Sequence, residues 1–116
     1  MSEENSNCLF CKIAQGEIKA SVIYEDPEFL AFKDIHPKAP VHILVIPKIH
    51  RESLADLTEQ DAELMGRLTC KLKIIAESQG LKNGFRTIIN TGPGGGQEIG
   101  HIHYHVLGGG PLLGFK

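Results

Sequence analysis

Runs of β-branched and aromatic residues in the first half of the chain predict three strands. They cover residues 21–26, 29–34 and 41–47, and residues typical of turns separate them. The Asp26-Pro27 dipeptide leaves so short a connection between the first two strands that a hairpin is expected. The third run, VHILVIP, is strongly β-branched and ends at a proline, which favours a central strand.

The next segment has the clearest helical period in the chain. Leucine and isoleucine recur every three or four residues within 57–80, and Thr58 with Asp61 resembles a capping box at its start. Gly80 is typical of a residue that ends a helix. Cys70 lies within the segment, and we expect it to be a small core residue.

The remaining segments predict one short helix and two further strands. Residues 7–18 fit a short helix with Asn7 as its N-cap, and residues 85–90 and 101–107 fit strands. The glycine-rich loop between these two strands, 91–100, is long enough to indicate a function. Three strands, a long helix and two more strands predict an α+β fold with an antiparallel sheet of about five strands.

Length and charge limit the classes of protein that this sequence fits. A chain of 116 residues predicts a single domain over 1–116, and its small core leaves apolar surface that an oligomer would cover. The net charge of −2 gives no overall electrostatic attraction to nucleic acid or to an anionic membrane. No secretory signal or membrane-length apolar run is visible, so a cytoplasmic location is expected.

Three histidines alternate along the last predicted strand, in the sequence GHIHYHVLGGG. Side chains alternate between the faces of a strand, so His101, His103 and His105 share one face and the residues between them pack on the core. A solvated face and a set of metal ligands are two interpretations of this pattern. The third is a nucleophile, because the preceding glycine-rich loop can bring backbone amides to a phosphate that a neutral imidazole attacks. The third arrangement is typical of phosphoryl or nucleotidyl transfer.

The run HIHYHVL resembles the signature of the histidine triad family, in which histidines alternate with apolar residues. The resemblance continues in the same order and spacing through CLFCKIAQGEI, AFKDIHPKAPVHILVIPKIH, GGGQE and LGG, and covers nearly the whole chain. The sequence is similar to the HINT-like branch, the histidine triad nucleotide-binding proteins, in a bacterial-type version. This resemblance implies the histidine triad fold and a homodimer with a continuous sheet.

The resemblance also implies an activity, the hydrolysis of purine nucleoside 5′-phosphoramidates such as adenosine 5′-monophosphoramidate and AMP-lysine. His103 matches the family's nucleophile, which forms a nucleotidyl-histidine intermediate that water hydrolyses to AMP or GMP. His105 matches a histidine that contacts the phosphate. His42 matches one that supports the triad, and a buried core histidine is the plainer interpretation of His42. Dinucleoside polyphosphate hydrolysis, and a nucleotide- or zinc-binding regulatory module with little turnover, are the alternative functions.

Further matches concern the nucleotide itself. Asp34 matches the family's ribose-binding acid, since a carboxylate can accept hydrogen bonds from both ribose hydroxyls, and a turn-forming aspartate is the alternative. The resemblance assigns contacts with the base to Phe32 and Ile35. It assigns contacts with the rest of the nucleotide to residues in and just before the glycine-rich loop, namely Asn90, Gly96, Gln97 and Glu98.

Cys8 and Cys11 have the spacing of a metal-ligand pair, but one pair is only half of a tetrahedral site. His50 and His101 are the candidates for the other two ligands, and some bacterial members of the family resemble this arrangement and bind zinc. A redox-active pair and a pair of partly buried thiols are the alternatives, although the βαβ surroundings of a thioredoxin-like pair are absent. We therefore expect a structural Zn²⁺ ion and no organic cofactor.

Overall fold

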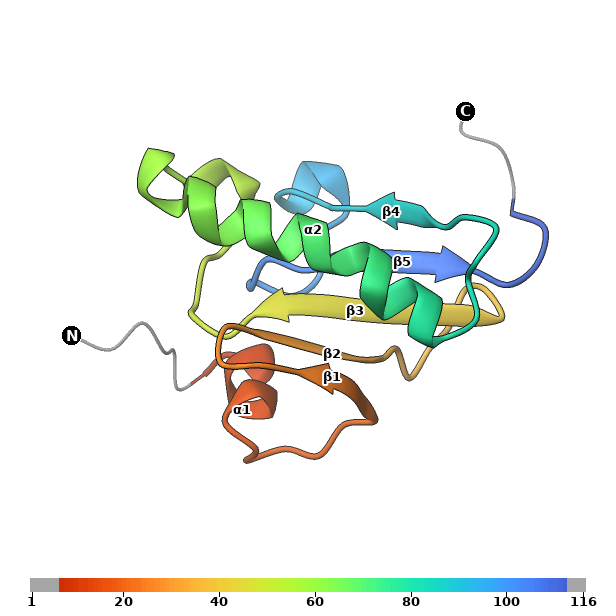
Figure 1. Cartoon of the computed structure of the whole chain (residues 1–116). Coiled ribbons are helices and arrows are strands. Elements are labelled where there is room, and N and C mark those ends of the chain that lie inside the picture. Colours follow the sequence, from red (N-terminus) through yellow and green to blue (C-terminus); the bar gives the residue numbers. More distant parts are fainter. Residues whose placement is uncertain (1–6, 113–116) are drawn as a thin grey trace.

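A computed structural model describes residues 7–112, in which five strands form one antiparallel sheet (Figure 1). The order across the sheet is β1-β2-β3-β5-β4. The strands are β1 (Val22–Glu25), β2 (Phe29–Lys33), β3 (Val41–Pro47), β4 (Arg86–Ile88) and β5 (Tyr104–Gly108). The same residues contain a short helix, α1 (Leu9–Ala14), and a long one, α2 (Ala62–Ser78). The predicted α+β fold, with one long and one short helix on a five-stranded antiparallel sheet, is confirmed.

β3 is the strand around which the sheet is built, because it pairs with β2 on one side and with β5 on the other. Its alternate side chains pack into two different layers. Ile43 and Val45 belong to the cluster beneath α2, whereas Leu44 and Ile46 belong to the cluster around α1. Both faces of β3 are therefore covered, which is why its sequence is nearly continuous in apolar residues.

α2 follows a 3₁₀ turn, Glu59–Asp61, in which Thr58 and Asp61 form the predicted capping box. Gly80 follows the helix with a φ of +87°, a conformation that glycine adopts without strain. The buried stripe of the helix consists of Met65, Leu68, Leu72, Ile75 and Ala76. Cys70 is exposed, so its predicted core position is wrong, because a residue two positions from Leu68 and Leu72 points away from their face.

No helix among residues 7–112 has the length and apolar character needed to cross a bilayer.

α1 is only six residues long, and a thiol caps its N-terminus. The predicted N-cap at Asn7 is wrong, because the Sγ of Cys8 accepts the Cys11 N–H at 3.3 Å in the cap position. Phe10 and Cys11 are the buried residues of this helix. They pack on the face of the sheet opposite α2.

β5 begins at Tyr104, so the predicted strand over 101–107 starts too early. His101 and His103 lie in the extended segment before it, where the Ile102 N–H donates to the Arg51 carbonyl at 2.7 Å. The alternation of faces nevertheless continues through this segment. The residues between and after the histidines are buried in the cluster beneath α2, as predicted: Ile102, Tyr104 and Val106.

Candidate functional site

The pairing of β3 with β5 brings most of the predicted catalytic residues together. His105 lies opposite Leu44, which places it diagonal to His42 on the same face of the sheet. His42 Nε2 is 2.9 Å from His105 Nδ1. Asp34, the residue after β2, places its Oδ2 3.4 Å from His42 Nε2. The ring of His103 lies against that of His105, with 4.9 Å between the ring centroids.

His103 presents a lone pair on a fixed nitrogen. Its Nδ1 lies 2.8 Å from the carbonyl oxygen of His101. A carbonyl oxygen only accepts, so Nδ1 carries the ring proton and Nε2 keeps its lone pair. Burial lowers the pKa of His103, and the bond to the His101 carbonyl and the charge of Asp34 oppose this only in part. The ring is therefore neutral at pH 7 and chemically suited to attack an electrophile through Nε2.

The main chain also sets the proton position on His42 and, through it, on His105. The Lys38 N–H donates to His42 Nδ1 at 3.0 Å, so the proton of the neutral ring is on Nε2. That proton is donated to His105 Nδ1, with the Asp34 carboxylate as a more distant acceptor. His105 accepts at Nδ1 and so carries its own proton on Nε2, where it can donate to a ligand.

Burial keeps both members of this pair neutral. It is the main cause that lowers the pKa of His42, and the Asp34 carboxylate partly opposes it. Burial also lowers the pKa of His105 to about 4, with a smaller contribution from the neighbouring rings of His103 and His42. Neutral rings at pH 7 are what the proton positions above require.

Gln97 uses its whole side-chain amide to brace the glycine-rich loop. Its Oε1 accepts the Gly92 N–H at 2.8 Å. Its Nε2 donates to the carbonyl oxygens of Glu52 and Ile99 at 2.7 and 2.8 Å. The residue lies in the loop as predicted, but its polar atoms are engaged with the backbone, so it holds the shape of the loop.

Of the other predicted loop residues, Asn90 also braces the loop, whereas Gly96 and Glu98 are exposed on it. Asn90 Nδ2 donates to the Gly95 carbonyl at 2.8 Å and thus closes the loop from the end of the preceding segment. Gly96 has a φ of +83°, in the left-handed region that favours glycine. Asn90 and Gln97 therefore fix the conformation of a loop on which Gly96 and Glu98 are exposed.

The residues predicted to contact the base and the ribose lie in different environments. Phe32 is only 4% exposed, whereas Ile35 is 84% exposed and open to a ligand. Asp34 Oδ1 accepts the His36 N–H at 2.8 Å, so this aspartate does form a turn. Its Oδ2 remains directed toward His42. One carboxylate oxygen of Asp34 therefore forms the turn, and this does not exclude the predicted ligand contact by the other.

Four residues predicted as metal ligands converge at the other end of the triad. Cys8, Cys11, His50 and His101 each offer one ligand atom, and these atoms all lie within 4.8 Å of one another. The Nδ1 of His101 is 3.3 Å from Cys8 Sγ, 3.5 Å from Cys11 Sγ and 3.2 Å from His50 Nδ1. Tetrahedral zinc, with bonds of about 2.0 Å to nitrogen and about 2.3 Å to sulfur, places its ligand atoms roughly 3.3–3.8 Å apart. The spacing in this cluster fits such an ion.

The proton position on His101 fits a metal ligand as well. Its Nε2 lies 2.9 Å from the carbonyl oxygen of Pro47, so Nε2 carries the proton and the Nδ1 lone pair points into the cluster. Burial lowers the pKa of His101 to about 4, which keeps this lone pair available. A ligand histidine that donates its other N–H to a carbonyl is the usual arrangement around bound metals.

A second group, Asp34, His42 and His105, also has ligand atoms within 4.8 Å of one another, but it does not fit a metal. The 2.9 Å separation of His42 Nε2 and His105 Nδ1 is that of a hydrogen bond. The Lys38 N–H already occupies the other nitrogen of His42. A metal at Nε2 would have to displace the ring proton, so this group is a proton-ordered pair with a carboxylate.

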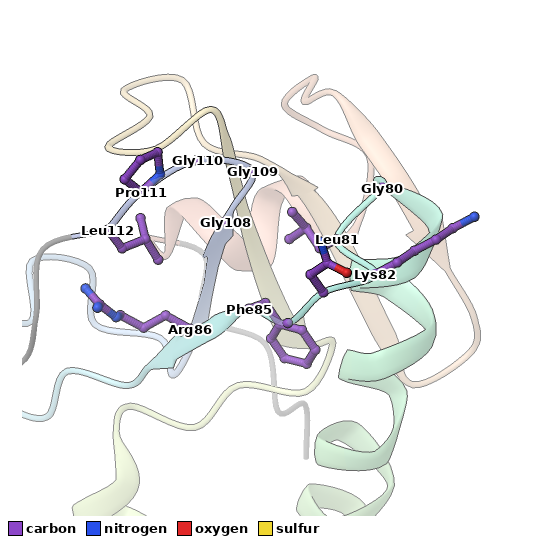
Figure 2. A pocket seen from close by; sticks show the side chains of 12 residues that line it. Gly80, Leu81, Lys82, Phe85, Arg86, Gly108, Gly109, Gly110, Pro111 and Leu112 are labelled. Atoms are coloured by element: carbon purple, nitrogen blue, oxygen red, sulfur yellow. The ribbon is translucent and has the colours of Figure 1, made fainter.

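A surface pocket of about 800 Å³ lies apart from the histidines, between the segment after α2 and the glycine run after β5 (Figure 2). A Cβ on Gly108 would lie 2.9 Å from Leu81 Cδ2, so these glycines permit close packing of the two segments. Within the described part of the chain, neither a histidine nor Asp34 lines this pocket. A smaller hollow of about 170 Å³ includes Asp34 and His42.

Sequence reasoning missed three groups that shape the site. The Lys38 N–H and the Pro47 carbonyl are backbone groups, which no residue-type pattern identifies. Phe10 is different, because an aromatic residue between Cys8 and Cys11 on a short helix was visible in the sequence. Its ring centroid lies 5.1 Å from that of His103.

These features define an α+β protein with an ordered histidine cluster at the entry to its last strand. A family model described as "Scavenger mRNA decapping enzyme C-term binding" matches residues 7–111. Protein HitA of Neisseria gonorrhoeae is 52% identical over 88% of this chain and 95% of its own. A 14 kDa zinc-binding protein of Zea mays is 45% identical, over 91% and 84% of the two chains. Adenylylsulfatase HINT1 of Arabidopsis thaliana is 45% identical, over 90% and 73%.

Solved structures agree with these relatives. A HIT family hydrolase from Legionella pneumophila Philadelphia 1 matches with a TM-score of 0.89 and 49% identity, over 92% of this chain and 96% of that one. A histidine triad protein from Clostridium difficile matches with a TM-score of 0.93 and 44% identity, over 97% and 99%. The chain belongs to the histidine triad family, and its relatives include hydrolases.

Stability should fall as the pH drops below the ordinary pKa of histidine. His105 has a folded-state pKa of about 4, so below about pH 6.5 the unfolded chain binds a proton that the folded chain excludes. Between pH 6.5 and 4 this lowers the free energy of unfolding by up to about 1.4 kcal/mol per pH unit. Urea unfolding across this range should give a shallower pH dependence for His105→Asn than for the wild type. His36→Asn, at an exposed loop histidine, is the control, and equal slopes for wild type and His105→Asn would contradict the assignment.

Proposed function

We propose that this protein hydrolyses purine nucleoside 5′-phosphoramidates, such as adenosine 5′-monophosphoramidate and AMP-lysine, through a nucleotidyl-histidine intermediate. The observation that carries the proposal is the bond of His103 Nδ1 to the His101 carbonyl at 2.8 Å, which leaves a neutral lone pair at Nε2. The glycine-rich loop directly precedes this residue and offers backbone to a phosphate. Membership of a family that includes hydrolases supports the reaction class.

The reaction divides into two displacements. In the first, His103 Nε2 attacks the α-phosphorus, a P–N bond to the histidine forms, and the P–N bond to the amine breaks. His105 Nε2–H, which the proton order of the site supplies, donates a hydrogen bond to the leaving nitrogen, and the amine takes its proton from solvent as it leaves. In the second, water attacks the same phosphorus and gives up its proton to solvent, and the bond between phosphorus and His103 Nε2 breaks. The sum is substrate plus water giving free amine and the nucleoside monophosphate.

His42 acts as a positioning residue in this scheme. Held by the Lys38 N–H, it directs its Nε2–H to His105 Nδ1 and so keeps the proton of His105 on the nitrogen that faces the substrate. Asp34 binds the ribose hydroxyls, and Ile35 contacts the base from its exposed position. Phe32 shapes the base site from within the core.

The glycine-rich loop binds the phosphate through its backbone in this proposal. Gly96 and Glu98 contribute from the exposed part of the loop, and Asn90 and Gln97 act by fixing its conformation. The side chain of Glu98 is exposed, so its carboxylate can lie away from the bound phosphate.

The leaving group has one alternative that a relative supports. The Arabidopsis relative is named an adenylylsulfatase, which favours adenylyl sulfate as a second candidate substrate. The same attack by His103 on the α-phosphorus would then expel sulfate, which leaves without a proton and so without help from the His105 hydrogen bond. The two substrates therefore differ in their dependence on His105.

We further propose that Cys8, Cys11, His50 and His101 hold one structural Zn²⁺ ion. The spacing of the ligand atoms and the proton position on His101 support this, as does the likeness to a plant protein named as zinc-binding. A bound zinc ion would tie α1 to the segment that enters β5 and would supply cross-linking, with no part in the displacements.

The homodimer with a continuous sheet remains our proposal, and the two edges of the sheet favour β4 as the joining strand. β1 carries a register shift between Val22 and Tyr24, a bulge of the kind that protects an edge. β4 forms the other edge, and Ile88 on it is 37% exposed. A second copy pairing with β4 would cover this isoleucine and extend the sheet across a twofold axis.

The catalytic proposal is tested by steady-state kinetics on adenosine 5′-monophosphoramidate, adenylyl sulfate and a diadenosine polyphosphate side by side. The phosphoramidate should have the highest kcat/KM. His103→Ala should lower it at least ~10³-fold because the nucleophile is gone. AMP binding by this variant should stay within about tenfold, or about 1.4 kcal/mol, of the wild type. Absence of turnover on all three substrates by the wild type would instead indicate a binding module.

The metal proposal is tested by elemental analysis of protein purified without added zinc. The wild type should contain about one zinc equivalent per chain, and Cys8→Ser should lose it because a tetrahedral site lacks a ligand. Cys70→Ser is the matched control, since Cys70 is exposed on α2 outside the cluster, and should retain the metal. Less than about half an equivalent in the wild type would count against a structural site.

The dimer proposal is tested by light scattering coupled to size-exclusion chromatography. A charge on the joining edge opposes pairing, so Ile88→Lys should shift the protein from dimer to monomer. Val22→Lys places the same charge on an exposed residue of the opposite edge and should leave the dimer intact. A monomeric wild type, or a shift caused only by Val22→Lys, would refute β4 as the joining strand.

A further inference from the structure

The Cys/His cluster and the proposed nucleophile share one residue. His101 directs its ring Nδ1 into the cluster, and its own carbonyl oxygen accepts the Nδ1–H of His103 at 2.8 Å. Any displacement of the His101 backbone therefore changes the bond that fixes the proton and the orientation of His103. This is the first of two physical links between the cluster and the nucleophile.

Phe10 provides the second link. It lies in α1 between Cys8 and Cys11 and is only 4% exposed. Its ring meets the His103 ring edge to face, with 5.1 Å between centroids and an interplanar angle of 88°. It makes a similar contact with the ring of His101, at 6.0 Å and 72°. Edge-to-face contacts at these separations are the favoured arrangement of aromatic rings. Phe10 therefore restrains the orientation of the His103 ring through this preferred geometry as well as by filling space.

The position of Phe10 depends in turn on the cluster. α1 has six residues, far fewer than the ~12–15 that an isolated helix needs to persist in water. Its N-cap is the Cys8 thiol, and its buried residues are Phe10 and Cys11. The same two sulfur atoms that fix the start and the buried face of α1 belong to the ligand set. Ligation of the cluster therefore fixes the helix that carries Phe10.

We propose that Phe10 is a positioning residue for His103, and that it couples metal occupancy of the Cys8–Cys11–His50–His101 cluster to the orientation of the His103 ring. The inference rests on the proposed function, in which His103 is the nucleophile. Loss of the metal releases α1, Phe10 moves, and His103 loses the contact that holds its Nε2 toward the phosphorus. Linkage makes the coupling reciprocal, so a nucleotide that orders His103 strengthens metal retention.

Phe10→Leu is the variant that tests the coupling, because it keeps an apolar side chain and removes the ring. Phe29→Leu is the matched control, since Phe29 is fully buried in the cluster beneath α2, on the other face of the sheet. Both substitutions should lower the free energy of unfolding. Phe10→Met serves as a second variant if Phe10→Leu does not fold.

The first readout is the ¹⁵N spectrum of the imidazole rings, which reports proton position without any turnover. In the zinc-loaded wild type and in Phe29→Leu, His103 should give the pattern of a ring protonated at Nδ1. In Phe10→Leu, and in the wild type after zinc removal, the two His103 nitrogen signals should move toward each other as the tautomers interconvert. Unchanged His103 signals in both of these samples would overturn the proposal, whatever the enzyme's activity.

The second readout compares kinetics and metal retention. Phe10→Leu should lower kcat on adenosine 5′-monophosphoramidate about tenfold with KM within about twofold, because the nucleophile is misaligned while the nucleotide site remains. Saturating AMP should slow transfer of zinc to a chelator in the wild type and in Phe29→Leu, and should have no effect in Phe10→Leu. Equal kcat values for the two folded variants, or equal protection of zinc by AMP in both, would refute the coupling.

Discussion

The antiparallel pairing of β3 with β5 is the constraint on which the rest of this molecule depends. It places His105 diagonal to His42, and the pairing of β2 with β3 brings Asp34 to the same side. It also leaves the segment that enters β5 free of the ladder, where His101 and His103 turn their polar groups toward backbone carbonyls. A shift of β5 by one residue would turn His105 to the face beneath α2, which is filled with apolar side chains. The packing of the core therefore enforces the geometry of the site.

Three backbone groups give the histidines their chemical identities. The His101 carbonyl places the proton of His103 on Nδ1, the Lys38 N–H places that of His42 on Nε2, and the Pro47 carbonyl places that of His101 on Nε2. Burial lowers the pKa of each of these rings, which keeps them neutral and makes the proton position meaningful. Four imidazoles thus differ in which nitrogen keeps its lone pair and which donates a hydrogen bond, as the proposed roles of nucleophile, hydrogen-bond donor, orienting group and metal ligand require. The difference lies in what the main chain offers to each ring.

Much of this could be predicted from the sequence, because the relevant patterns are periodic or carried by residue type. Alternation along GHIHYHVL correctly placed Ile102, Tyr104 and Val106 in the core beneath α2, although the first residues of this run lie outside β5. The capping box and the stripe of α2 followed from spacing alone. The predicted core position of Cys70 is wrong because the residue was assigned to the core as a small apolar residue, without regard to the face of the helix on which it lies. The bracing hydrogen bonds of Gln97 could not be predicted from the sequence, since their three partners are backbone atoms that only the folded loop brings together.

The shared role of His101 has a consequence for how substitutions in this triad are interpreted. Its ring and its carbonyl serve different neighbours, so replacing the side chain removes a proposed metal ligand while leaving the acceptor for His103 formally present. If the proposed function holds, a loss of activity at this position reports on the backbone that the ligand holds in place, whereas a loss at His103 reports on the attacking atom itself. Phe10 touches both rings, and neither of its contacts involves a proton. An effect of Phe10 on the proton position of His103 would then arise from packing and orientation, directly or through His101, which separates positioning from chemistry within a single site.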